Sequence, residues 1–292
     1  MADRIDTSYF DLRHTFESAQ PLTFHADAEI EKGYMRYSTY DDVLQLRFFG
    51  DSRSGSIHMK SLAGMPEHCV EKEVVRRFRL NDDLPKIYKM INTDNAIGNA
   101  TRHFHGMRLT LNDPWEATLC FIVSQFNNVK RIRLIVRKLI ATYGMEIKDK
   151  EGRVIGKAFP RSEDLAGATE KELMECGTGF RGRYIASAAK FCTNNLDLYK
   201  LNAKDYDSLM ENLMEIDGVG EKVADCVALM GYGNLRAFPI DVWVKRTLEK
   251  MYFNGKDKNI KYLKEFAQER WGDYAGYAQQ YIFWHGREIM KK

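Results

Sequence analysis

A Gly-Val-Gly turn interrupts a helix-patterned segment between residues 209 and 230, and this feature constrains the fold most strongly. Apolar residues recur at helical spacing up to Ile216, which predicts a helix before the turn. Gly218, Val219 and Gly220 predict a tight turn, because glycine adopts the positive φ angles that other residues avoid. A second helix is predicted after the turn. The segment is therefore expected to form a helix–hairpin–helix, whose backbone N–H groups can approach a phosphate.

Three side chains near this turn carry reactive or polar groups. Lys222 lies in the first turn of the second helix, where the positive end of the helix dipole favours a neutral amine. Such an amine is a nucleophile that forms a Schiff base with a sugar or carbonyl carbon. Asp241 is expected to cap the next helix, and its carboxylate is suited to stabilise positive charge at a breaking glycosidic bond. Cys226 lies one helical turn beyond Lys222, so both are expected on one face.

The run GVGEKVADC, which ends at Cys226, and PIDV, which begins at Pro239, together resemble the helix–hairpin–helix DNA glycosylases. Within them the chain is most similar to the 8-oxoguanine DNA glycosylase/abasic-site lyase family. The resemblance implies a bifunctional enzyme that excises an oxidised purine, with 8-oxoguanine as the expected lesion. It also implies Lys222 as the nucleophile and Asp241 as the essential carboxylate. The implied partner is damaged double-stranded DNA, and the implied chemistry needs no cofactor, with room for a monovalent cation at the hairpin. We also expect a monomer, because a single lesion presents no symmetry to match.

Composition is typical of a globular protein of one or two domains. The chain has 292 residues, of which 44% are hydrophobic, so it can bury a sizeable core. Its net charge of +3 means that DNA contact must come from local patches. The five cysteines include no CxxC pair, which argues against a zinc site, and none follows Cys226, so an iron–sulfur loop is not expected. We expect an intracellular protein, because no membrane span or signal peptide is evident.

The pattern along the chain predicts an α+β fold. Residues 1–85 are expected to form a β-rich domain with an antiparallel sheet, and residues 86–292 a helical domain of two lobes with the DNA site between them. Strands are predicted at 34–40, 43–49 and 56–59. After residue 84 only helices are expected, with a polar loop at 145–165 and one short helix at 164–176.

One helix start is predicted in detail. Asp113 precedes Pro114, which suits the N-cap and first helical positions. Glu116 is expected to complete a capping box with Asp113, because a carboxylate at that spacing can accept the cap residue's own N–H.

The resemblance further implies a pocket for the flipped base. The string AGYAQQYIF places Gln279 and Phe283 at helical spacing i, i+4, so both can face one pocket. By this match Gln279 binds the edge of the base, while Phe283 and Cys226 lie on its two faces. Pro239 and Ala19 complete the implied base-binding set.

Two turns are implied to contact DNA. The run NDPWEATLCFIVSQFNNVKRI matches the family segment whose asparagine-rich turn enters the gap left by the flipped nucleotide. Asn127 and Asn128 carry amides suited to base edges, and Arg131 lies on the basic face of the next helix. The run GTGFRGR matches a turn that presents an aromatic wedge. There Phe180 would insert beside the lesion pair and Arg181 would reach the opposite base or a phosphate.

Four positions depart from the family pattern. Ala19 stands where the family has a glycine whose carbonyl accepts the N7–H bond that distinguishes 8-oxoguanine from guanine. Phe126 replaces an asparagine that faces the estranged cytosine. Trp243 replaces a histidine, and Gly286 replaces an aspartate, with Arg287 next to it. These departures leave the exact lesion and the preference for the opposite base open.

Two alternatives to the main hypothesis remain. A glycosylase for alkylated or deaminated purines is compatible with Ala19 and Trp243, although a monofunctional enzyme of that kind does not need Lys222. A non-catalytic protein that binds damaged DNA is compatible with the hairpin alone. A covalent adduct through Lys222 would separate these hypotheses.

Overall fold

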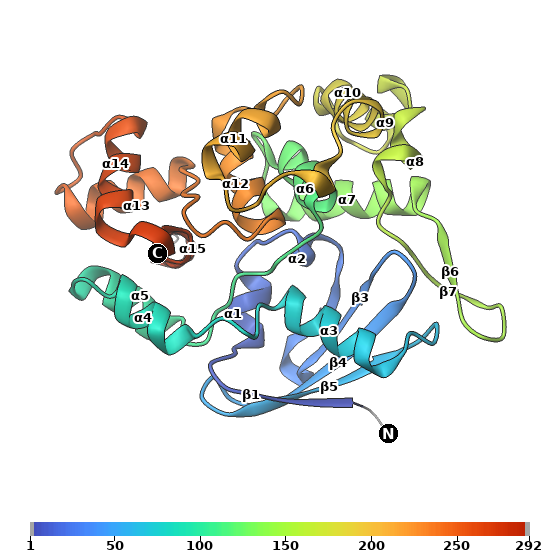
Figure 1. Cartoon of the computed structure of the whole chain (residues 1–292), viewed down its shortest axis with the longest axis horizontal. Helices are drawn as coiled ribbons and strands as arrows, with labels where there is room; N and C mark the ends of the chain where they lie inside the picture. Colours follow the sequence, from blue (N-terminus) through green and yellow to red (C-terminus); the bar gives the residue numbers. More distant parts are fainter. Residues whose placement is uncertain (1–2, 290–292) are drawn as a thin grey trace.

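The computed structural model describes residues 3–289 and contains a five-stranded antiparallel sheet beneath a larger set of helices (Figure 1). The spatial order of the strands is β1-β5-β4-β3-β2. Their bounds are β1 Asp3–Thr7, β2 Asp27–Glu29, β3 Tyr34–Ser38, β4 Val43–Gly50 and β5 Gly55–Ser61. The three predicted strands are confirmed as β3, β4 and β5. The two short edge strands were missed.

Alternation of apolar and polar residues explains the sheet. Met35, Leu44, Leu46 and Ile57 are fully buried on its inner face. Helices α1 (Leu12–Glu17) and α3 (Glu67–Arg77) contribute to the same core. The side chains they add include those of Leu12, Phe16, Val70 and Val74. The sheet therefore has its own hydrophobic core.

The helices form two groups, which lie on the left and on the right in Figure 1. The left group comprises α4 Leu84–Ile91, α5 Asn95–His103, α13 Val242–Tyr252, α14 Ile260–Trp271 and α15 Ala275–Ile289. The middle and right comprise α6 Pro114–Ser124, α7 Val129–Tyr143, α8 Ser162–Ala166, α9 Glu170–Glu175, α10 Arg181–Asn194, α11 Tyr206–Met214 and α12 Glu221–Gly231. A short helix α2 (Leu22–His25) packs against α7. The predicted fold class, a sheet followed by a helical domain, is confirmed.

The prediction of helices only after residue 84 is wrong at one place. Strands β6 (Glu146–Lys148) and β7 (Val154–Lys157) form a hairpin within the predicted loop. The Asp149 carboxylate accepts backbone N–H groups of Glu151 and Arg153 at 3.0 and 2.9 Å, which stabilises the turn. The β6–β7 hairpin is rich in charged residues, and only Ile147 supplies it with a buried apolar side chain. The sequence therefore lacks the alternation that predicts strands. The single helix predicted at 164–176 is also wrong, since α8 and α9 are separate.

The capping box predicted at α6 is wrong as well. Asp113 caps α6 as expected, but the Glu116 carboxylate turns into the protein. It accepts hydrogen bonds from Arg77 Nη1 at 2.9 and 3.1 Å and lies 3.0 Å from His25 Nε2. Burial opposes ionisation, but Arg77 and His25 lower the pKa of Glu116 to about 2. This network joins α6 to the N-terminal part of the chain.

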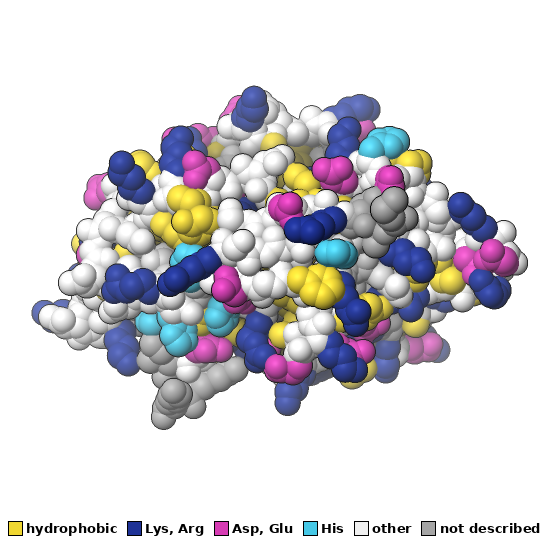
Figure 2. Space-filling view, turned by 90° about the horizontal axis from the view of Figure 1, so that it is seen from below, with side chains coloured by type: hydrophobic (Ala, Val, Ile, Leu, Met, Phe, Trp, Pro, Cys, Tyr) yellow, Lys and Arg dark blue, Asp and Glu magenta, His cyan; other side chains and the backbone are white. Residues whose placement is uncertain are grey.

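Charges are mixed on the face seen from below, on the side of the sheet (Figure 2). Lys and Arg side chains are interspersed there with Asp and Glu, so this face offers no continuous basic surface. Among the helices between residues 3 and 289, none combines the length and apolar character needed to span a bilayer.

Candidate active site

The predicted hairpin lies between α11 and α12, and its glycines have distinct roles. Gly218 has φ +83°, and a Cβ there would lie 2.6 Å from the Tyr184 ring, so only glycine fits. Gly220 is the N-cap residue of α12 and faces open space, while Val219 is buried beneath the turn. Gln125 Nε2 donates to the Gly218 carbonyl at 3.0 Å. The hairpin is thus fixed against α10 and the α6–α7 turn.

Lys222 and Asp241 line one cavity of about 120 Å³. Lys222 comes from the first turn of α12, and its Nζ lies 5.6 Å from the centroid of the Phe121 ring. Asp241 caps α13, and its Oδ1 accepts the Val244 N–H at 2.8 Å. The structure therefore brings the amine and the carboxylate, which are 19 residues apart in sequence, to the same cavity.

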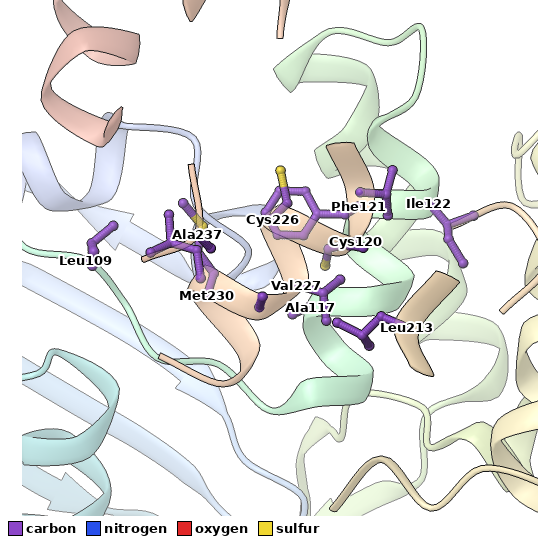
Figure 3. Close-up of a cluster of buried hydrophobic side chains, with 14 of the residues drawn as sticks. Leu109, Ala117, Cys120, Phe121, Ile122, Leu213, Cys226, Val227, Met230 and Ala237 are labelled. Atoms are coloured by element: carbon purple, nitrogen blue, oxygen red, sulfur yellow. The ribbon is translucent and has the colours of Figure 1, made fainter. Parts of the chain in front are cut away.

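Cys226 forms part of the cavity wall, next to Phe121 (Figure 3). Its side chain is buried between α12 and α6, where α12 packs closely. Burial raises the pKa of Cys226 to about 11, although the positive charge of Lys222 lowers it. The thiol is therefore neutral near pH 7 and acts as a small apolar surface rather than as a nucleophile.

Gln279 and Phe283 reach the same cavity from α15. Gln279 Nε2 donates to the Pro239 carbonyl at 3.1 Å, which fixes the orientation of the amide. Its Oε1 is buried and, within the described part of the chain, has no hydrogen-bond partner. A buried acceptor without a donor costs free energy, so this oxygen is suited to receive an N–H group from a ligand.

Ala19 lines the cavity from the N-terminal part of the chain, in the turn between α1 and α2. It has φ +60°, a left-handed conformation that favours glycine. Gln20 fixes this turn, because its Nε2 donates to the Arg108 carbonyl at 2.8 Å and its Oε1 accepts the Thr110 N–H at 2.7 Å. Gln280 on α15 donates to the Ser18 carbonyl at 2.9 Å. The Ala19 backbone is thus held against the pocket.

Two exposed aromatic side chains stand near the hairpin. Phe126 is 94% exposed and has φ +47°, a strained conformation for an aromatic residue. Phe180 is 47% exposed, and its ring centroid lies 6.4 Å from that of Phe126. Large apolar groups held in solvent by a strained turn indicate a binding surface.

The polar residues predicted on these turns have mixed placements. Arg181 is buried and donates to the backbone carbonyls of Gln125, Phe126 and Thr178, so it holds the turn that carries Phe126. Asn128 caps α7, and Asn127 lines the cavity with its Nδ2 bonded to a backbone carbonyl. Arg131 is exposed on α7. Direct contacts of these four side chains with DNA stay predictions.

The structure explains why Gly286, on the α15 side of the cavity, differs from the aspartate of the family pattern. Gly286 on α15 packs so closely on α13 that an added Cβ would collide with the Thr247 hydroxyl, which excludes an aspartate there. Trp243 and Arg287 occupy this region and both line the cavity. The Arg287 guanidinium lies over the rings of Trp243 and Phe283.

Sequence reasoning missed Phe121 as a cavity residue. Residues 115–123 of α6 are all buried, so periodicity could not show which of them faces a site. Arg287 was noted but given no role, although its i, i+4 spacing from Phe283 places both on one face of α15. Across residues 3–289, no group of three or more His, Cys, Asp or Glu side chains could hold a metal ion.

Comparison with known proteins identifies the family. Residues 119–273 match the HhH-GPD superfamily of base excision DNA repair proteins. Residues 4–118 match the N-terminal domain of 8-oxoguanine DNA glycosylase. The chain belongs to the 8-oxoguanine glycosylase branch of this superfamily. The family predicted from the sequence is therefore confirmed, and members of this superfamily are DNA repair enzymes.

Individual relatives extend over nearly the whole chain. The chain is 27% identical to the probable N-glycosylase/DNA lyase of Methanothermobacter thermautotrophicus, covering 97% of this chain and 96% of the relative. It superposes on MBOgg1 in complex with a low-affinity DNA ligand with a TM-score of 0.86 and 31% identity, covering 99% and 97% of the two chains. It superposes on the Clostridium acetobutylicum 8-oxoguanine glycosylase/lyase bound to DNA with a TM-score of 0.84 and 27% identity, covering 99% and 98%.

Proposed function

We propose that this protein is a bifunctional 8-oxoguanine DNA glycosylase and abasic-site lyase that acts in base excision repair. The observation that carries the proposal is the single cavity that contains Lys222, Asp241 and the base-binding candidates Cys226, Gln279 and Phe283. These residues come from three separate parts of the chain, so their convergence is a property of the fold rather than of one motif.

The proposed chemistry uses the amine and the carboxylate in turn. As the glycosidic bond breaks, the base leaves with the bonding electrons, and positive charge at C1′ is stabilised by Asp241. The Lys222 amine, once it has given up its proton, forms a bond to C1′, loses a second proton and opens the sugar to a protonated Schiff base. Removal of a C2′ proton then expels the 3′ phosphate as the C3′–O bond breaks. No metal or organic cofactor takes part in these steps.

The free oxygen of Gln279 favours a guanine-type lesion. Guanine and 8-oxoguanine present N–H donors on the edge where adenine presents a ring-nitrogen acceptor, and Gln279 Oε1 can accept from such a donor. Phe283 and the neutral Cys226 thiol supply apolar surfaces for the two faces of the base. Pro239 contributes through its carbonyl, which orients Gln279. Deaminated purines also carry such a donor, so they remain the substrate alternative.

The DNA backbone is proposed to lie along the hairpin and the two aromatic turns. The α12 N-terminus at Gly220 faces open space and would accept a phosphate, and the exposed rings of Phe126 and Phe180 would fill the gap left by a flipped nucleotide. Affinity should therefore fall with added salt. We also propose a monomer, because a single lesion has no two-fold symmetry, and a monovalent cation at the hairpin carbonyls.

Borohydride trapping tests the proposal. The wild-type protein should give a covalent adduct with a duplex that contains 8-oxoguanine, and Lys222→Gln should give none. Lys72→Gln, which changes an exposed lysine on α3, is the matched control and should trap normally. A duplex panel with each modified purine opposite each normal base tests the substrate. Binding without any adduct in the wild type would favour the non-catalytic alternative instead.

A further inference from the structure

A guanidinium without an acidic partner lies at the reaction cavity. Arg287 Cζ is 5.9 Å from the centroid of the Trp243 ring and 5.6 Å from that of Phe283. Its Nε is buried and has no hydrogen-bond partner among residues 3–289. Within the described part of the chain, no carboxylate lies within ion-pair distance of this group. The two rings thus hold a cation whose charge the protein itself leaves without a counterion.

A second arginine in the same lobe shows what a completed arrangement looks like. Arg270 Cζ lies 5.0 Å from the Tyr252 ring centroid and 5.6 Å from that of Phe266. Its Nε also donates to Asp94 Oδ2 at 3.1 Å, and its Nη2 forms an ion pair with the same carboxylate. The aromatic support is therefore alike at the two sites, and only the anion differs.

The electrostatic environment of Arg287 favours a ligand anion. Burial lowers the pKa of Arg287, although the charge of Asp241 opposes that effect. The guanidinium nevertheless stays charged at any physiological pH, so its partial desolvation costs free energy until an anion approaches. Asp241 does not serve as that anion, because it lies beyond ion-pair distance and caps α13.

When a nucleotide binds, before its glycosidic bond breaks, its only anionic part is the backbone phosphate, since the base that would fill the cavity is still neutral. Trp243 lies in the first turn of α13, whose positive dipole end favours an anion at the same place. We propose that Arg287 binds the backbone phosphate adjoining the flipped nucleotide and so positions the sugar against Lys222. This inference rests on the proposed function, because it assumes that a nucleotide enters the cavity.

Phosphate neutralisation tests the contact. Duplexes carry a tetrahydrofuran abasic analogue, which cannot form a Schiff base, and one methylphosphonate in place of each flanking phosphate in turn. For the wild type, affinity should fall about tenfold at one position. Arg287→Met should bind the unmodified duplex about tenfold more weakly, lose nothing further at that position, and show a salt slope smaller by about 1.

Two further variants make the result decisive. Arg270→Met removes an arginine whose charge already has a partner, so it should keep the wild-type salt slope and methylphosphonate profile. Arg287→Lys keeps the charge and should retain part of the phosphate sensitivity. If Arg287→Met loses as much affinity as the wild type at every methylphosphonate and keeps its salt slope, the inference is overturned. Borohydride trapping of the wild type is measured in parallel. If the wild type forms the adduct, the proposed function stands and only the Arg287 contact is wrong; if it forms none, the proposed function itself fails.

Discussion

Lys264 and Asp225 form an ion pair in which Nζ and Oδ2 are 2.5 Å apart. Lys264 Nζ also lies 2.6 Å from Glu221 Oε1, and Tyr206 donates to Asp225 Oδ1 at 2.5 Å. Glu221 and Asp225 lie on either side of Lys222 along α12, so α11 and α14 both contact the first two turns of the helix that carries the proposed nucleophile. The position of the amine therefore depends on contacts outside the cavity.

Loss of this ion pair should destabilise the protein. Lys264→Met leaves the fully buried Asp225 carboxylate without a cation, which typically lowers the free energy of unfolding by about 3–5 kcal/mol. Urea unfolding measures the loss. Lys261→Met, an exposed lysine on the same helix, should change stability by less than about 0.5 kcal/mol. Equal stability of the two variants would contradict the role of the pair.

Acid should weaken the ion-pair network of Glu116, which connects α6 to the N-terminal part of the chain. The folded-state pKa of Glu116 is lowered from 4.5 to about 2, so its contribution is complete above pH 4.5 and lost as pH falls toward 2. That shift corresponds to about 3 kcal/mol. Glu116→Gln should be less stable at pH 7 and lose less on acidification, as urea unfolding at several pH values will show. An acid slope equal to that of the wild type would rule out this contribution.

Phe126 should control the preference for the opposite base. Phe126→Asn restores an amide where the family reads cytosine, so excision opposite cytosine should increase relative to the other three bases by about tenfold, as expected for one good base contact of 1–3 kcal/mol. Stability should rise slightly, because asparagine tolerates the φ of +47° better than phenylalanine. Single-turnover rates against all four partners measure the change, and Phe49→Asn on the sheet serves as the exposed control.

Ala19→Gly should improve both stability and selectivity. The substitution relieves a left-handed alanine, and the net gain in unfolding free energy is expected to be about 0.5 kcal/mol after the larger entropy of the unfolded glycine chain is subtracted. The ratio of 8-oxoguanine to guanine excision should rise as the methyl group leaves the cavity. Ala186→Gly in α10 should have the opposite effect on stability. An unchanged excision ratio would count against the proposed role of this turn.

Residues around the cavity could be predicted where their structure depends on a sequence pattern of only a few neighbouring residues. The hairpin glycines, the Asp241 cap and the i, i+4 pair on α15 all depend on neighbours within a few residues. Other features depend on distant partners. Strand β1 gains its partner β5 only in the folded sheet, and the carboxylate of Glu116 pairs with residues 39 and 91 positions away. A pattern of nearby residues contains no record of such pairings.

The hydrogen bond from Gln280 to the Ser18 carbonyl joins residues 262 positions apart and has a consequence for folding. The turn that presents Ala19 gains this brace only after α15 has packed against it, and closing so long a loop costs entropy. A partly folded chain in which α15 has not yet packed lacks one wall of the pocket, including Gln279 and Phe283. Such a chain can present Lys222 on its helix and still have no complete pocket for a base.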